Sequence, residues 1–176
     1  MQTTQESKSN SKKTGQNKKS TSSELLEIDR EFNVPIETLF NAFTTIEALK
    51  VWWWPKGLYA DQIEMDFKEG GRYFINMKGF DRGGGGMTGE FQEIVQNSRI
   101  VMTDYFADEN GLKITAEEAK MPGQWPETVY ITLEFESLGP EKSRLHLAQE
   151  GIPKEMRKDC IKGWSESFDK LEEYLE

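Results

Sequence analysis

The chain ends in the segment PKEMRKDCIKGWSESFDKLEEYLE, residues 153–176, in which apolar residues recur every three or four positions. This spacing stacks side chains on one face of a 3.6-residue helix and predicts a long amphipathic helix. Pro153 suits its first position, because the backbone N–H that proline lacks would have no partner there. The apolar face comprises Met156, Cys160, Ile161, Trp164, Phe168, Leu171 and Leu175. A helix with such a face needs a wide apolar surface on which to lie.

Alternating apolar and polar residues upstream predict the strands that supply this surface. The first is 26–32, where Arg30 places a charge among the apolar positions. Two short helices follow, one opened by Pro35 and one capped by Thr44 or Thr45. Further strands are expected at 58–67, 72–78, 87–95, 99–107, 129–135 and 144–149. Because most connections between strands are short, we predict an α+β helix-grip fold, a curved antiparallel sheet wrapped around the C-terminal helix.

Two connections stand out from this pattern. Residues 81–86, Asp-Arg followed by four glycines, are expected to form a flexible hairpin loop. Residues 108–127 form a longer connection, and loops of that length in compact domains are often functional. We expect a lid over a site there, or a short helix around Thr115–Lys120.

The first residues differ in composition from the rest. Residues 1–23 hold no aromatic residue and no aliphatic residue beyond Met1, so we expect a disordered basic and polar tail before a single domain at 24–176. The tail carries five lysines and one glutamate, so that the formal net charge of −9 leaves −13 for residues 24–176. Nucleic-acid binding relies on Lys and Arg to neutralise phosphates, and the acidic body argues against it.

The inventory of reactive side chains is small. With one cysteine, the chain cannot hold an internal disulfide, and one His with one Cys cannot make a typical zinc site. His146 is expected to face away from Leu145 and Leu147, and Cys160 to behave as a small buried hydrophobe. We therefore predict no catalytic residue, no metal and no cofactor. No apolar run resembles a signal peptide or reaches the ~20 residues of a membrane span, so we expect a cytoplasmic protein.

Several ordered motifs resemble one known family. Residues 52–57, WWWPKG, resemble the W-W-x-P-x-G stretch of the START-like (SRPBCC) superfamily, and within it the activator of heat-shock-protein-90 ATPase homologues. Residues 70–73, GGRY, resemble that group's glycine pair opening a strand. Residues 89–91 and 99–101 resemble its G-E-[YF] and R-L-V segments, and Gly163-Trp164 with Leu171 its final helix. The resemblance covers residues 24–176 and implies a deep cavity between sheet and helix that takes apolar or aromatic molecules.

Aromatic and methionine side chains on the predicted elements suit such a cavity, since ligand pockets are mainly apolar with a few polar groups. Gln149 or Tyr105 would hydrogen-bond a polar end of the ligand. The expected cavity residues are Tyr73, Met77, Met102, Tyr105, Tyr130, Gln149, Met156, Trp164 and Phe168. The residues expected at its mouth, or in contact with a partner, are Trp52, Trp53, Trp54 and Trp125.

These observations favour a non-catalytic protein that binds an apolar small molecule. One alternative is a co-chaperone-like interaction module that stimulates a heat-shock ATPase, with the tryptophan run as contact surface. The other is an enzyme, a cyclase or hydrolase that uses the cavity to position its substrate. Whether there is any catalytic activity stays open, because no residue pair shows the spacing of a catalytic dyad.

Overall fold

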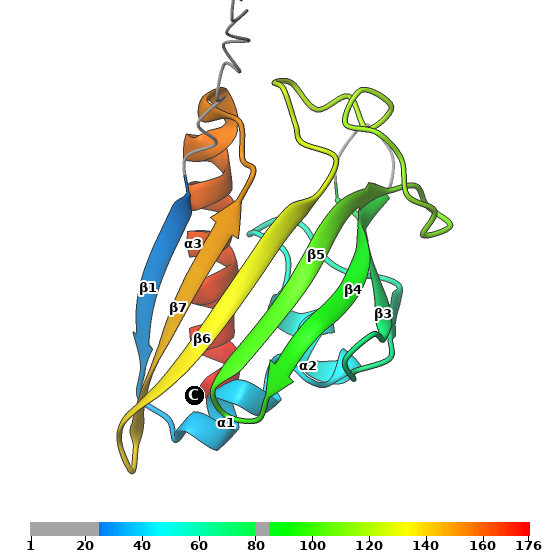
Figure 1. Ribbon diagram of the computed structural model, residues 1–176. Helices are drawn as coiled ribbons and strands as arrows, with labels where there is room; N and C mark the ends of the chain where they lie inside the picture. Colours follow the sequence, from blue (N-terminus) through cyan, green and yellow to red (C-terminus); the bar gives the residue numbers. More distant parts are fainter. Residues whose placement is uncertain (1–24, 80–84) are drawn as a thin grey trace, which may run out of the picture.

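The computed structural model describes residues 25–79 and 85–176. Within them, seven strands form one sheet in the order β1-β7-β6-β5-β4-β3-β2, with every neighbouring pair antiparallel (Figure 1). The strands are β1 (Leu26–Phe32), β2 (Ile63–Met65), β3 (Arg72–Met77), β4 (Gly85–Val95), β5 (Arg99–Ala107), β6 (Val129–Gly139) and β7 (Lys142–Glu150). The expected disorder at 1–23 lies outside the described residues, as do residues 81–84 of the loop expected at 81–86, whose last two glycines, Gly85 and Gly86, belong to β4.

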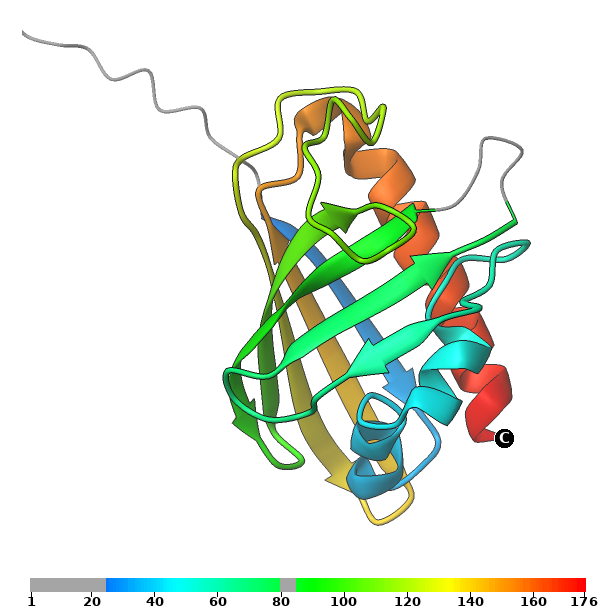
Figure 2. The same ribbon diagram turned by 90° about the vertical axis from the view of Figure 1, so that its right-hand side faces the viewer.

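The C-terminal helix lies against the concave face of this sheet, as Figure 2 shows from the side. It is α3 (Arg157–Leu175), preceded by a 3-10 turn, η1 (Lys154–Met156). Phe168 and Leu171 on its inner face are completely buried. The predicted helix-grip fold is therefore confirmed. The regular helix begins later than predicted, because Pro153 is extended (ψ 143°) and the first turn is 3-10.

Two short helices follow β1, as predicted. They are α1 (Ile36–Asn41) and α2 (Ile46–Trp52), and the Thr45 hydroxyl caps α2 by accepting a hydrogen bond from Ala48 N at 3.3 Å. Both lie at the end of the molecule where α3 ends (Figure 1). Their apolar residues close that end of the space between sheet and helix.

Strand β2 is much shorter than the predicted strand at 58–67. Tyr59 makes only an isolated bridge with Lys78, and regular pairing with β3 is confined to Ile63–Met65. At the other hairpin, β6 runs to Gly139 and β7 starts at Lys142, so both strands are longer than alternation alone indicated. These long central strands provide the curved wall.

Candidate functional site

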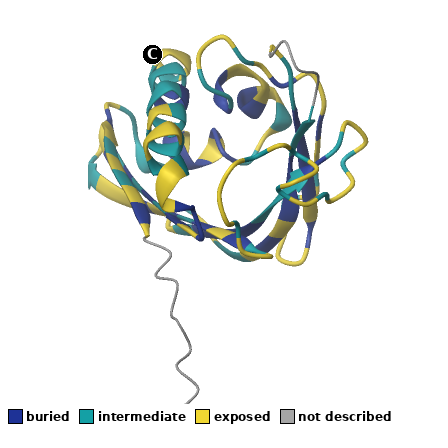
Figure 3. Ribbon diagram, turned by 90° about the horizontal axis from the view of Figure 1, so that it is seen from above, coloured by how far each residue is buried: buried dark blue, intermediate teal, exposed yellow. Residues whose placement is uncertain are grey.

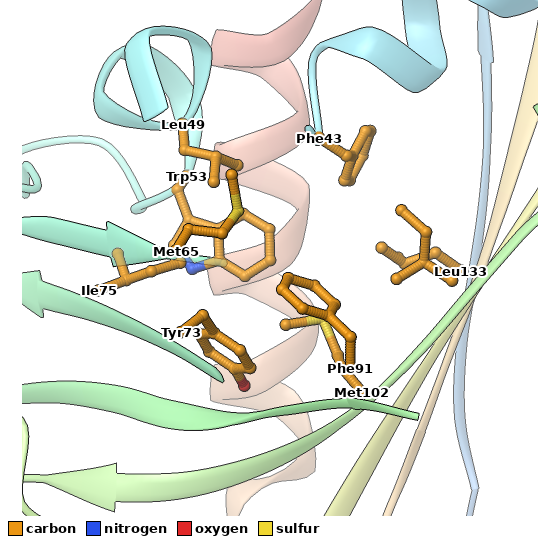
Figure 4. Close-up of a pocket in the computed structure, with 10 residues that line it drawn as sticks. Phe43, Leu49, Trp53, Met65, Tyr73, Ile75, Phe91, Met102 and Leu133 are labelled. Atoms are coloured by element: carbon orange, nitrogen blue, oxygen red, sulfur yellow. The ribbon is translucent and has the colours of Figure 1, made fainter. Parts of the chain in front are cut away.

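The interior between the sheet and α3 is closely packed at the end covered by α1 and α2. The side chains there leave a cavity of ≈ 10 Å³ (Figure 4). Such a volume holds about one water molecule at most. We call this region the packed end; its cavity is lined by Phe43, Leu49, Trp53, Met65, Tyr73, Ile75, Phe91, Ile100, Met102 and Leu133. The deep cavity that the resemblance implied is filled there by side chains.

The tryptophan run contributes to this filling. Trp52 is fully buried and donates its indole N–H to Ala42 O at 2.9 Å, so its side chain lies in the core. Trp53 is also buried, with its indole N–H 3.2 Å from the sulfur of Met87. Trp54 is half-buried and donates to Asn76 O at 3.1 Å. Because α2 ends at Trp52 and the chain turns there, the run points into the interior and toward β3.

The opposite end of the concave face is partly open to solvent. Ile100 and Met102 line the internal cavity, and the two-residue period of a strand places Asp104 and Phe106 on the same face. Whereas Ile100 and Met102 are at most 3 % exposed, Asp104 and Phe106 are half-buried. Half-buried side chains on a concave face indicate that solvent enters there. We call this region the open end, defined by Met77, Asp104 and Phe106 of the sheet with Cys160 and Trp164 of α3.

A chain of hydrogen bonds crosses the open end from helix to sheet. Trp164 of α3 donates its indole N–H to Oε1 of Gln149 at 2.9 Å. Gln149 in turn donates through Nε2 to a carboxylate oxygen of Asp104 at 3.5 Å. Burial raises the pKa of Asp104 to about 7, with no neighbouring charge among the causes. Ionisable groups perturbed in this way are more frequent at functional sites than elsewhere.

Two further side chains lie near this carboxyl. The Cys160 pKa rises to about 11, first through burial and then through the charges of Asp159 and Asp104. Tyr73 donates its hydroxyl to Thr103 O at 2.6 Å, and burial, followed by the charges of Asp104 and Tyr105, raises its pKa well above the ordinary value. Both groups are therefore neutral at physiological pH. Neither can compensate a charge on Asp104.

The long connection at 108–127 runs over the open end of the sheet, which faces the viewer in Figure 3. On the outer face it covers Phe74, since a side chain at Gly111 would meet that ring at 2.9 Å. Its middle is a turn at residues 116–120 and not a regular helix, and Thr115 and Glu118 exchange hydrogen bonds there. On the inner face its Trp125 packs edge-on against Phe106, with ring centroids 4.9 Å apart. The loop therefore passes over the ends of the strands and contacts Phe74 on the outer face and Phe106 on the inner face. We call residues 108–127 the strap.

The predicted site residues fall into separate groups. Tyr73 and Met102 line the internal cavity, Phe168 is in the core, and Trp164 and Gln149 meet at the open end. Met77 and Met156 are half-buried at that end of their elements. Tyr105 and Tyr130 do not belong to the cavity wall.

Strand alternation explains where the side chains of those two tyrosines lie. Tyr105 is three residues after Met102 and Tyr130 is next to the buried Ile131, so each faces the convex side. Tyr130 is 42 % exposed, and the ring of Tyr105 lies 3.8 Å from the ammonium of Lys113. The same alternation could have identified Asp104, which the sequence reading missed.

The convex face carries charged side chains in pairs. His146 faces away from its leucine neighbours as predicted, and its ring nitrogens lie 3.0 Å from Asp29 and 3.5 Å from Glu27. Arg144 bridges Glu31 and Glu136, each at 3.0 Å. In the described part of the chain, no group of three His, Cys, Asp or Glu side chains is placed to hold a metal ion. Over the same residues, no helix is long and apolar enough to cross a membrane.

Comparison with known proteins identifies relatives of this arrangement. The family model described as "Activator of Hsp90 ATPase homolog 1-like protein" matches residues 33–176. Protein CV1439 from Chromobacterium violaceum is similar in structure, with 25 % identity, a TM-score of 0.71, and coverage of 86 % of this chain and 96 % of the other. The AHSA1 protein from Silicibacter pomeroyi has 24 % identity, a TM-score of 0.70, and coverage of 86 % and 97 %.

Protein Ms6760 from Mycobacterium smegmatis has 20 % identity, a TM-score of 0.71, and coverage of 86 % of this chain and 90 % of the other. At this identity the likeness is one of fold. No match was found among curated proteins.

Proposed function

The chain belongs to the activator of Hsp90 ATPase homolog 1-like family of the START-like superfamily, and from this premise we propose that it binds an apolar or aromatic small molecule without transforming it. The ligand lies at the open end, between α3 and the upper concave face, under the strap at 108–127. Proteins of this fold have many different activities, so the argument depends on the side chains at the open end and not on the fold.

One observation carries the proposal. A polar chain, Trp164–Gln149–Asp104, lies among half-buried apolar side chains on a concave face. Ligand sites combine a mainly apolar wall with a few convergent polar groups, and this end of the molecule has both. The packed end offers ≈ 10 Å³ and has no room for such a ligand without rearrangement, which favours the open end of the concave face.

The experiment is an amide-NMR titration against a panel of fatty acids, sterols and polycyclic aromatics. We expect saturable shifts at 103–107, 125–129 and 156–164. Trp164→Ala should weaken binding while the spectrum stays dispersed. Tyr130→Ala, an aromatic truncation on the convex face, is the matched control and should bind as the unaltered protein does. Shifts confined to the convex face, or equal affinity in Trp164→Ala, would contradict the proposal.

The two alternatives have less support. An interaction module would need an exposed tryptophan run, and Trp52 and Trp53 are at most 4 % exposed. An enzyme would need a second acid–base group beside Asp104, and the nearby Tyr73 and Cys160 both have raised pKa values. A pull-down with a heat-shock ATPase, compared between the unaltered protein and Trp54→Ala, tests the first alternative directly.

A further inference from the structure

The carboxyl of Asp104, on the concave face of β5, has weak hydrogen bonding. Among the described residues its hydrogen bond comes from Gln149 Nε2 at 3.5 Å, at the limit for such a bond. None of the salt bridges in residues 25–79 and 85–176 involves Asp104. Even partial desolvation of a carboxylate without a countercharge is unfavourable, and natural proteins pair such groups or neutralise them.

Among the described residues, the groups that face Asp104 from β7, α3 and β3 supply no positive charge. Strand β7 contributes the amide of Gln149, and α3 contributes the indole of Trp164 and the thiol of Cys160. Strand β3 contributes the phenol of Tyr73. The lysine of the strap, Lys113, lies over the ring of Tyr105 on the other face of β5. Within residues 25–79 and 85–176, no positive charge is thus placed to pair with this carboxylate, and a cationic ligand would supply one.

We propose that the open end takes a cationic amphiphile, an apolar or aromatic molecule bearing a protonated amine, whose ammonium group pairs with Asp104. This inference rests on the proposed function and names the ligand class. The amide of Gln149 donates to this carboxylate and accepts from the indole of Trp164, and the apolar body of the ligand lies on Trp164 and Phe106. The aromatic faces also attract an ammonium group through their quadrupoles.

Two further observations favour a cationic ligand over an anionic one. Residues 24–176 carry a formal charge of −13, which attracts cations and repels anions over the whole surface. A fatty acid bound in the same way would place its own carboxylate beside that of Asp104, and two neighbouring negative charges repel each other. Electrostatics alone therefore favour the binding of an apolar amine over that of an apolar carboxylate.

The experiment compares three probes with one ring system: 1-naphthylmethylamine, 1-naphthalenemethanol and 1-naphthoate. Affinities are measured by amide-NMR titration at pH 8, where Asp104 is mainly ionised. We expect the amine to bind about tenfold more tightly than the alcohol, the effect of one charged hydrogen bond. The naphthoate should bind most weakly.

Asp104→Asn should abolish the preference for the amine and leave the affinity of the alcohol nearly unchanged. Glu150→Gln removes an exposed carboxylate near the same end of the sheet and is the control for general surface charge. At pH 5.5 the unaltered protein should lose most of its preference, because Asp104 is then neutral while the amine stays protonated. Equal affinities for amine and alcohol at pH 8, or an unchanged preference in Asp104→Asn, would overturn the inference.

The titration distinguishes a wrong ligand class from a wrong binding site. If the alcohol binds at the open end but the amine binds no better, the ligand class is wrong and the site remains. If none of the three probes shifts the open-end amides at millimolar concentration, this inference is overturned, and the panel titration described above decides separately whether the site binds another apolar ligand.

Discussion

The guanidinium of Arg30 in β1 lies 3.0 Å from the carboxylate of Asp169 in α3. Arg30 occupies an inward position of an otherwise apolar strand face, and it also pairs with Glu172 at 2.5 Å. The charge that interrupts the sequence pattern of β1 therefore joins the edge strand to the helix. Its contacts are partly exposed, with side-chain exposures of 30 % and 39 %.

We predict that Arg30→Met lowers the free energy of unfolding by about 0.5–1 kcal/mol at pH 7, the range of exposed ion pairs. The pKa of Asp169 is lowered, first by its hydrogen bond with Arg30. A lowered folded-state pKa gives a contribution that is present above the ordinary value of 3.8 and is lost as the pH falls through the lowered pKa. Urea unfolding should therefore show a smaller difference between the two proteins at pH 3 than at pH 7. A constant difference would contradict the pairing.

Asp104→Asn should stabilise the protein at pH 8 and leave it nearly unchanged at pH 4. The folded-state pKa is raised to about 7, so the Asp104 contribution is most favourable below 3.8 and is lost as the pH rises through 7. We expect a gain of order 2 kcal/mol at pH 8, discounted for partial exposure. Thermal unfolding across pH 4–8 measures it. A loss of stability at pH 8 would show that the carboxylate has a compensating partner.

Gly89→Ala should destabilise the fold strongly. A Cβ at this position would lie 2.0 Å from Thr103 O and 2.9 Å from the Tyr73 hydroxyl, and neighbouring strand backbone cannot move aside. We expect a loss of about 3 kcal/mol, at the upper end of overpacking effects. Gly163→Ala in α3 is the comparison, because its new Cβ meets only Pro55 at 3.4 Å. It should raise stability by about 0.5–1 kcal/mol through helix propensity.

Cys160 should react slowly with iodoacetamide in the folded protein. Its pKa rises from 9.0 to about 11, so at pH 8 the thiolate population falls about a hundredfold relative to an unperturbed thiol. The rate should recover in 8 M urea, where burial is removed. A folded-state rate close to the unfolded one would mean that the open end exposes this thiol fully.

Trp125→Ala should loosen the strap at 108–127. Its ring packs on Phe106 and its indole N–H donates to Pro122 O at 2.8 Å, so both contacts are lost together. We expect faster amide hydrogen exchange at 108–127 with little change in α1 and α2. If a ligand binds at the open end, its dissociation should also accelerate. Unchanged exchange in the strap would show that Phe74 and the turn at Thr115 hold it alone.

Local patterns of apolar and polar residues predict much of the fold. The spacing of apolar residues in α3 and the alternation in β6 each depend on a single element, and both were predicted before any tertiary contact was known. The same alternation rule, applied across β5, would have excluded Tyr105 and selected Asp104. Residue type alone does not make this distinction, because it does not say which face of a strand a side chain occupies.

Other features depend on contacts between distant segments. Whether the interior is hollow depends on how Trp52, Trp53 and Phe168 pack together, and no single element determines this. The sequence by itself determined the helix, most strands and the antiparallel order, because hydrophobic periodicity is a local property. Only the tertiary structure decided that the tryptophan run fills one end and that Gln149 joins Asp104 to Trp164 at the other. Those positions depend on the curvature of the sheet and on where α3 lies across it.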